Sequence, residues 1–147
     1  MIAVDTGYFT ALADADDAPH DLAKQWLPSA QEGWVVTWPV VTETCYLLSA
    51  RFRKAAKADF MHEATHGGRL IWDIPAVAAK AIPRRMRKYA KLPMDLADAS
   101  LVLLAEHLGH GRILTTDQRD FGAYRWKFTQ PFTNLMAQGK PPEARKN

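Results

Sequence analysis

The chain has 147 residues, of which 48% are hydrophobic and 24% charged, and its formal net charge is +3. This composition predicts one soluble globular domain and excludes a disordered chain. No apolar run reaches the ~20 residues that span a bilayer, and no secretory signal is recognised, so we expect a cytoplasmic protein without membrane contact. The single cysteine, Cys45, excludes an internal disulfide framework. The positive charge favours an anionic partner.

The first half of the chain alternates short apolar runs with helical patterns. Residues 1–5, "MIAVD", predict a strand that ends in an acid, and residues 33–38, "GWVVTW", form a β-branched run typical of a buried strand. Around these strands, helices are expected over residues 6–17, 18–31, 39–52 and 54–67.

The second half repeats this alternation. Strands are expected over residues 69–74 and 112–117, and helices over residues 75–91, 96–111 and 118–124. Pro83 should kink or interrupt the helix that contains it, because proline removes a backbone donor. Residues 125–135 fit either a strand or a helix, and residues 136–147 are expected to form a polar, disordered tail.

Strands that alternate with helices predict an α/β fold, with a mainly parallel sheet covered on both faces. Such sheets bind ligands at the carboxyl ends of their strands. Four acids lie where a strand gives way to a helix or where a helix begins: Asp5, Glu43, Asp98 and Asp117. Because several of these positions fall on one edge of a parallel sheet, we expect the four carboxylates to converge in one pocket.

Two aspartates in the segment "PMDLADAS" have two interpretations. Asp95 as N-cap and Asp98 in the first turn would satisfy free backbone amides and complement the helix dipole. Asp98 also shares a helix face with Leu101 and Val102, so its side chain should turn inward. The segment therefore predicts either an ordinary helix start or part of an acidic site.

A buried carboxylate without a partner is costly, and no lysine or arginine adjoins these acids on the same predicted faces. A divalent cation that prefers oxygen ligands, Mg²⁺ or Mn²⁺, is the natural counter-charge. His62 and His66 have the i,i+4 spacing of a zinc site but lack the HExxH pattern, and are expected on the surface.

The acids in "VDTGYF", "VVTETCYLL" and "DLADASLVLLAEHLGHGRILTTDQRDF" resemble those of PIN-domain ribonucleases, most closely the VapC toxins of toxin–antitoxin pairs. The resemblance runs from Asp5 to about Leu135. It implies a three-layer α/β/α sandwich, a nuclease domain over residues 1–135, and a pocket for one or two Mg²⁺ or Mn²⁺ ions. It also implies a homodimer and a cognate antitoxin protein that covers the acidic pocket.

The resemblance implies a role for each acid. Asp5 and Asp98 match direct metal ligands, whereas Glu43 and Asp117 match ligands of a second metal or acceptors for metal-bound water. Many relatives carry asparagine at the position of Asp117. Two further residues are expected to lie behind the ligands and orient them: Thr6 and Asp95.

Basic residues gather in two clusters that could contact RNA phosphates or simply form solvated helix faces. The first contains Arg51, Arg53, Lys54 and Lys57, and the second contains Arg84, Arg85, Arg87, Lys88 and Lys91. The first cluster could also lie near the bound antitoxin.

The sequence carries no Ser–His–Asp arrangement, activated cysteine or phosphate-binding loop, so metal-assisted hydrolysis is the mechanism that its residues permit. We predict a metal-dependent endoribonuclease that acts as the toxin of a toxin–antitoxin pair. Two alternatives stay open: a PIN nuclease in RNA maturation, and a non-catalytic nucleic-acid-binding domain.

Overall fold

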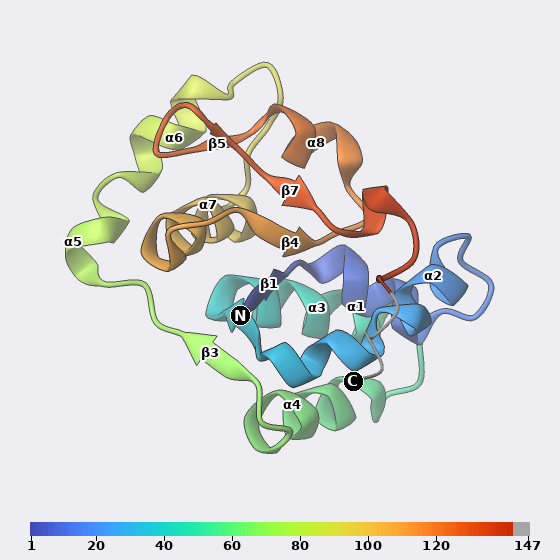
Figure 1. Cartoon of the computed structure of the whole chain (residues 1–147). Coiled ribbons are helices and arrows are strands. Elements are labelled where there is room, and N and C mark those ends of the chain that lie inside the picture. The colour runs from blue at the N-terminus through green and yellow to red at the C-terminus, as the bar shows by residue number, and fades with distance from the viewer. Residues whose placement is uncertain (143–147) are drawn as a thin grey trace.

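Five strands form the central sheet of the computed structural model, which describes residues 1–142 (Figure 1). The strand order is β3-β2-β1-β4-β7, and each neighbouring pair is parallel. The strands are β1 (Ile2–Val4), β2 (Trp34–Thr37), β3 (Leu70–Trp72), β4 (Arg112–Leu114) and β7 (Thr133–Asn134). This arrangement confirms the predicted α/β class with a mainly parallel sheet.

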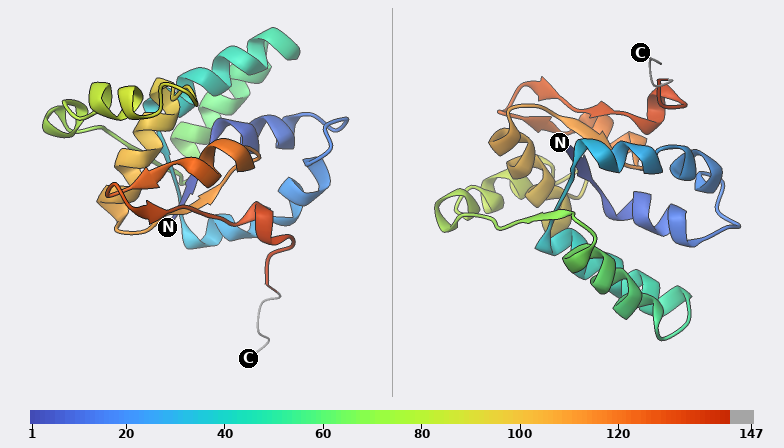
Figure 2. Two further views of the ribbon diagram at one scale, coloured as in Figure 1. Left: turned by 90° about the horizontal axis from the view of Figure 1, so that it is seen from above. Right: turned by 60° about the horizontal axis from the view of Figure 1, so that its bottom comes forward.

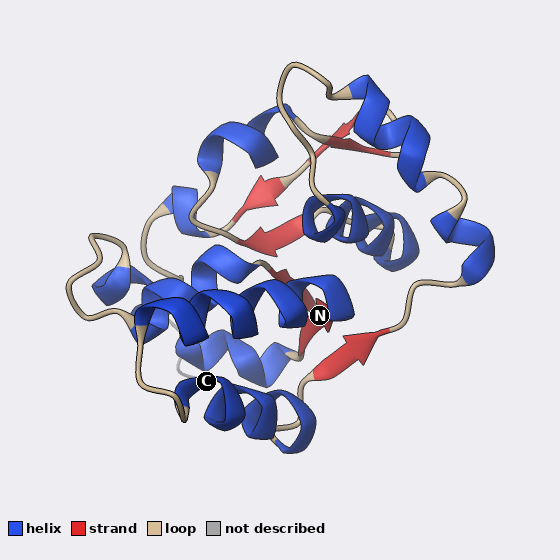
Figure 3. Cartoon of the chain, turned by 180° about the vertical axis from the view of Figure 1, so that it is seen from behind, coloured by secondary structure: helices blue, strands red, loops and turns tan. Residues whose placement is uncertain are grey.

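Helices flank the sheet (Figures 1 and 3). They are α1 (Thr6–Ala13), α2 (His20–Gln25), α3 (Trp38–Arg51), α4 (Ala56–His66), α5 (Ala76–Ala79), α6 (Ile82–Lys88), α7 (Leu96–Leu108) and α8 (Gln118–Ala123). Two 3-10 helices, η1 (Leu27–Glu32) and η2 (Met136–Gln138), complete the helical elements. Within residues 1–142, every helix is too short or too polar to cross a membrane.

The core lies between the two central strands and α7. All residues of β1 and β2 are buried, as expected for strands of a parallel sheet that is covered on both sides. Helix α7 contacts both strands through a run of buried apolar residues, which includes Leu101, Val102 and Leu104. This packing fixes the first turn of α7, where Asp98 lies, close to the carboxyl end of β1.

Two of the predicted helical segments are each divided into two helices. The helical pattern over residues 18–31 separates into α2 and η1 at Trp26, because Pro28 starts the 3-10 helix. The pattern over residues 75–91 separates into α5 and α6, with Pro83 in the first turn of α6. The interruption expected from Pro83 is therefore confirmed, although the break falls just before the proline.

Helices α3 and α4 lie side by side, and Figure 2 shows this pair extending away from the sheet. The segment over residues 125–135 contains an antiparallel hairpin, β5 (Arg125–Trp126) with β6 (Gln130–Pro131), followed by the edge strand β7. The tail predicted over residues 136–147 begins with packed residues: Met136 is buried, and the Gly139 carbonyl accepts from the Trp26 indole. Residues 143–147 lie outside the described residues.

Candidate active site

The structure brings the four acids together in one pocket of about 310 Å³. Asp5 directly follows β1, and Asp117 follows β4, the parallel neighbour of β1. Glu43 comes from α3 and Asp98 from the first turn of α7. Two more carboxylates line the same pocket, those of Asp95 and Asp120. The pocket therefore lies at the carboxyl edge of the sheet, as the parallel topology requires.

Asp5 is the most buried of these acids, with 6% of its surface exposed. Its Oδ1 accepts from the Thr6 amide at 2.8 Å, and its Oδ2 accepts from Thr115 Oγ1 at 2.8 Å. The pKa of Asp5 is raised to about 7, mainly by burial and to a smaller extent by the nearby carboxylates of Glu43 and Asp117, against the lowering effect of the two hydrogen bonds. Asp5 is thus held rigidly in an environment that disfavours its charge.

Asp98 combines both roles that the sequence allowed. It forms a capping box with Asp95, in which each side chain accepts from the other residue's backbone amide. Its Oδ2 also lies 3.1 Å from the Tyr124 hydroxyl, inside the fold. Burial raises the pKa of Asp98 to about 8, with further contributions from Asp95 and Asp5. Asp98 is both a helix cap and a member of the acidic pocket.

Glu43 and Asp117 are less buried. Glu43 Oε2 accepts from Thr6 Oγ1 at 3.1 Å. The pKa of Glu43 is raised, mainly by burial and to a smaller extent by the Asp95 carboxylate. Asp117 is the N-cap of α8, where its Oδ1 accepts from the Asp120 amide at 2.9 Å, and burial raises its pKa as well. Thr6 contacts both acids, because its backbone amide donates to Asp5 and its hydroxyl donates to Glu43, and its orienting role stays a prediction.

The donor chemistry of the pocket fits a divalent cation. Its ionisable lining is almost entirely carboxylate oxygen, the ligand that Mg²⁺ and Mn²⁺ prefer, and four of these acids have raised pKa values. Positive charge bound here would offset the mutual repulsion of the acids. Within residues 1–142, no three acid, histidine or cysteine side chains are arranged closely enough to hold an ion as they stand.

One expectation about the pocket is wrong. We predicted no lysine or arginine beside the acids, but Arg51 lines the pocket. Glu43, Leu47 and Arg51 are spaced four residues apart on α3, so they share one helix face, and all three reach the pocket. Arg51 is thus separated from its predicted companion Arg53, which pairs with Asp59 at 2.7 Å. Lys54 is exposed in the turn between α3 and α4.

The second basic cluster also divides. Arg84 and Arg87 are exposed on α6, but Arg85 is only 5% exposed and forms an ion pair with Glu106 of α7. Arg85 therefore fits neither of the two alternatives, a phosphate contact or a solvated helix face, because its guanidinium is buried and joins α6 to α7.

Two residues that support the acids were missed from the sequence. Thr115 is fully buried, and its Oγ1 bonds to Asp5 Oδ2 and accepts from the Asp117 amide at 3.0 Å. Tyr124 is fully buried beneath Asp98. The segment "ILTTD" did carry a signal for Thr115, since a hydroxyl at a strand end points to the same edge as the neighbouring acids.

Gly7 explains the glycine of the "VDTGYF" segment. A Cβ atom at this position would collide with Thr116 Oγ1, in the loop between β4 and α8. Glycine therefore lets α1 lie close to the Thr116 side chain of this loop.

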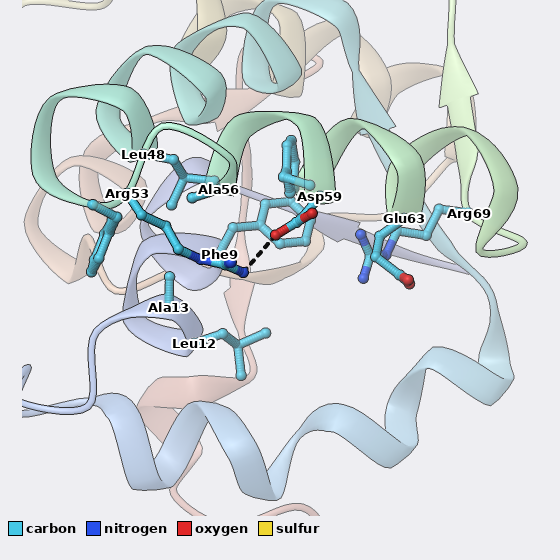
Figure 4. Close-up of a pocket in the computed structure, with 11 residues that line it drawn as sticks. Phe9, Leu12, Ala13, Leu48, Arg53, Ala56, Asp59, Glu63 and Arg69 are labelled. Carbon is cyan, nitrogen blue, oxygen red and sulfur yellow. Dashed lines mark hydrogen bonds and ion pairs between the residues drawn. The ribbon is translucent and has the colours of Figure 1, made fainter.

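A second, mostly apolar cavity of about 540 Å³ lies between α1, α3 and α4 (Figure 4). Its walls include Phe9, Leu12, Leu48, Phe52 and Phe60, and its polar rim carries Arg53, Asp59, Glu63 and Arg69. Helix α3 separates this cavity from the acidic pocket, because Leu47 faces the acids whereas Leu48 faces the apolar cavity.

A parallel sheet with a carboxylate-lined pocket at its carboxyl edge defines the class of this molecule, an α/β protein built around an acidic centre. The PIN domain family model matches residues 2–127, so the chain belongs to the PIN domain family. It is 30% identical to Ribonuclease VapC26 of Mycobacterium tuberculosis over 122 residues, which cover 83% of this chain and 90% of that protein.

A solved structure shows the same fold. The crystal structure of Mycobacterium tuberculosis VapC20, described as a sarcin-ricin loop cleaving toxin, superposes with a TM-score of 0.74 and 20% identity. The match covers 82% of this chain and 92% of VapC20. This similarity establishes the architecture, whereas the family is established by the domain match and by VapC26.

Proposed function

We propose that this protein is a metal-dependent endoribonuclease that hydrolyses RNA phosphodiester bonds, and that it is the toxin of a toxin–antitoxin pair. The observation that carries the proposal is the convergence of Asp5, Glu43, Asp98 and Asp117 in one pocket of a PIN domain. The identity to a protein named Ribonuclease VapC26 supports the choice of RNA as substrate. We place the protein in the cytoplasm, with a nuclease domain over residues 1–135.

Asp5 and Asp98 would hold a Mg²⁺ or Mn²⁺ ion, with Glu43 and Asp117 completing the set of oxygen ligands. A bound ion supplies positive charge and a lowered water pKa, which phosphodiester hydrolysis needs. Thr115 and the Thr6 amide fix both oxygens of Asp5, and the Tyr124 hydroxyl fixes Asp98. Asp95 orients Asp98 through the capping box.

Arg51 is the basic residue best placed to bind substrate at the pocket. It lies two helical turns from Glu43 on the same face of α3, and its side chain is exposed at the rim. A guanidinium in this position can bond to a phosphate oxygen of RNA beside the reacting one.

The proposal is tested by incubating the purified protein with RNA in Mg²⁺, in Mn²⁺ and in EDTA. We expect internal cleavage with either ion and none in EDTA. Expression in a host cell should arrest growth, and co-expression of a small protein encoded beside it should restore growth. Cleavage without growth arrest would favour a role in RNA maturation, and RNA binding without cleavage in any ion would show a non-catalytic domain.

We propose that the antitoxin covers the acidic pocket and also uses the apolar cavity of Figure 4. Apolar side chains of the partner would pack on Phe9 and Phe60, which are in edge-to-face contact at 5.0 Å. Arg69 lies against the Phe9 ring at the rim of this cavity, where its guanidinium would border the bound partner.

We propose that the protein forms a homodimer through an exposed apolar surface at the start of α3 and α7. Trp38, Tyr46 and Leu96 are 44%, 72% and 49% exposed, and all three line one hollow of about 720 Å³. Glu43 and Asp95 line both this hollow and the acidic pocket. Exposed apolar patches of this kind mark interaction surfaces.

Light scattering at micromolar concentration should give twice the mass of the chain for the parent. Tyr46→Arg should give the mass of a single chain, because a buried, unpaired charge at an interface weakens association by about 30-fold or more. Val77→Arg is the matched control, since Val77 is 75% exposed on α5, outside this surface. A monomeric parent, or a dimeric Tyr46→Arg variant, would contradict the dimer proposal.

A further inference from the structure

The turn between β5 and β6 has an unusual backbone. Lys127 and Phe128 have φ angles of 44° and 66°, and they are the two non-glycine residues with positive φ in the described chain. Side chains disfavour this left-handed region, so hairpin turns usually place asparagine or glycine there. A strained position that carries a large side chain is a reason to look for a function of that side chain.

Two neighbouring helices hold this turn in place. Glu106 Oε1 of α7 accepts from the Lys127 amide at 2.9 Å and also pairs with Arg85 of α6. Lys88 Nζ of α6 donates to the Phe128 carbonyl at 3.3 Å. The unusual conformation is thus imposed by contacts with α6 and α7.

The ring of Phe128 is presented to solvent among cations. Phe128 is 48% exposed. The guanidinium carbons of Arg84 and Arg85 lie 4.9 Å and 4.7 Å from its ring centroid, and Lys88 Nζ lies at 5.8 Å. Arg84 is itself exposed, so its guanidinium can move off the Phe128 ring to bind an anion. Another planar group can then stack on the ring face that it vacates.

The surface around this ring is strongly basic. Its exposed cations are Arg84 and Lys88, which lie beside the ring, and Lys127, which precedes Phe128 in the chain. The acid nearest the turn, Glu106, is already engaged by Arg85 and the Lys127 amide. An exposed aromatic ring bordered by several cations fits single-stranded nucleic acid, in which unpaired bases stack and phosphates pair with basic side chains.

This surface is joined to the acidic pocket by continuous structure. Tyr124, whose hydroxyl contacts Asp98, immediately precedes β5, and the Arg125 amide donates to the Tyr89 hydroxyl at 2.9 Å. Asp98 and Glu106 are eight residues apart on α7, which is about 12 Å along a helix. That span is about three to four nucleotides at the ~3.4 Å rise of a stacked strand.

We propose that the β5–β6 turn and α6 form a second RNA-binding site, in which a base of single-stranded RNA stacks on Phe128 while Arg84 and Lys88 bind the adjoining phosphates. The proposal rests on the proposed ribonuclease function and names where its substrate is held outside the acidic pocket. Arg85 is a positioning residue in this site, because its guanidinium is buried against Glu106.

The test measures binding of a short, fluorescently labelled single-stranded RNA by anisotropy in EDTA, over a series of KCl concentrations. Phe128→Ala should weaken binding by about 5- to 150-fold with an unchanged salt dependence, since stacking is lost but no charge is. Arg84→Gln should lower the slope of log affinity against log salt by about 0.7, the value for one lost phosphate contact. Phe128→Tyr should bind as the parent does.

Lys24→Gln, which removes an exposed cation on α2, is the control and should leave affinity and slope unchanged. Melting temperatures verify that each variant folds. The proposal is overturned if folded Phe128→Ala binds RNA as tightly as the parent, or if the parent binds no RNA. It is also overturned if the variant loses binding only to an acidic polypeptide such as polyglutamate, which would indicate a protein partner. RNA binding that depends on Phe128, without cleavage in Mg²⁺ or Mn²⁺, would contradict the proposed function and leave this site standing.

Discussion

Asp98→Asn is expected to lower RNA cleavage by about 10²-fold or more, while the metal-free protein remains at least as stable as the parent. The substitution preserves shape, and the asparagine oxygen can still accept from the Asp95 amide and the Tyr124 hydroxyl. It removes a carboxylate whose pKa is raised to about 8 by burial and by the neighbouring acids. Asparagine is neutral without taking up a proton, so the cost of burying an acid at this position is removed and the melting temperature in EDTA should increase by several degrees.

Asp95→Asn is the variant that distinguishes the proposed role of Asp98 in cleavage from its role at the helix start. Asparagine is a good N-cap, and Asp95 is exposed, so stability should change little. Cleavage should fall only about 10-fold, because Asp95 acts on the site by orienting Asp98. Asp21→Asn, in the first turn of α2, removes a similar carboxylate far from the pocket and should change neither quantity.

The measurements are melting temperature in EDTA and the cleavage rate in Mg²⁺ or Mn²⁺. If Asp98→Asn melts well below the parent and still cleaves RNA at the parental rate, then Asp98 serves the helix alone.

In EDTA, the melting temperature of the parent should fall as the pH rises from 6.5 to 8. The folded protein retains protons on Asp5 and Asp98 up to pKa values of about 7 and about 8, whereas the unfolded chain releases them near 3.8, the ordinary pKa of aspartate. Folding therefore binds protons in this interval, and stability is lost as the pH rises through the folded-state pKa values. Burial lowers the pKa of His110 below 6.5. Its titration therefore makes the protein more stable as the pH rises, but this effect falls below the pH interval of the test.

Mg²⁺ or Mn²⁺ should reverse this loss, with the largest increase in melting temperature at pH 8, where the ionised carboxylates bind cations best. Asp98→Asn should show a shallower decline in EDTA and a smaller response to either ion. A melting temperature in EDTA that is constant or rises between pH 6.5 and 8 would contradict the raised pKa values. Ca²⁺ at equal concentration is a useful comparison for the preference among divalent ions.

The alternation of strands and helices could be predicted because apolar runs such as "GWVVTW" and the long apolar face of α7 leave few alternatives. The meeting of Asp5, Glu43, Asp98 and Asp117 could also be predicted, since a parallel sheet directs the ends of its strands to one edge. Their catalytic and metal-binding roles remain predictions.

Side-chain partners that depend on tertiary packing could not be predicted. Arg85 follows Arg84 directly, yet only Arg85 is buried, because α6 turns that residue toward Glu106 on α7. The hairpin turn at Lys127 and Phe128 could not be predicted either, since neither residue favours a left-handed conformation. The contacts that impose it come from two helices that are far from the turn in the sequence. Arg51 was within reach of prediction, because its spacing of eight from Glu43 places both on one face of α3.

Helix α7 gives the two proposed RNA contacts a fixed register. Its first turn carries Asp98, and its last turn carries Glu106, which holds the turn that presents Phe128. Because the element between them is one unbroken helix, the separation of the scissile bond from the stacked base is set by backbone geometry and varies little. An insertion of one residue within α7 would rotate one end against the other by about 100° and lengthen it by ~1.5 Å. In the uninterrupted helix, the length of α7 would therefore determine which phosphodiester bond is cut, counted from the nucleotide that is stacked on Phe128.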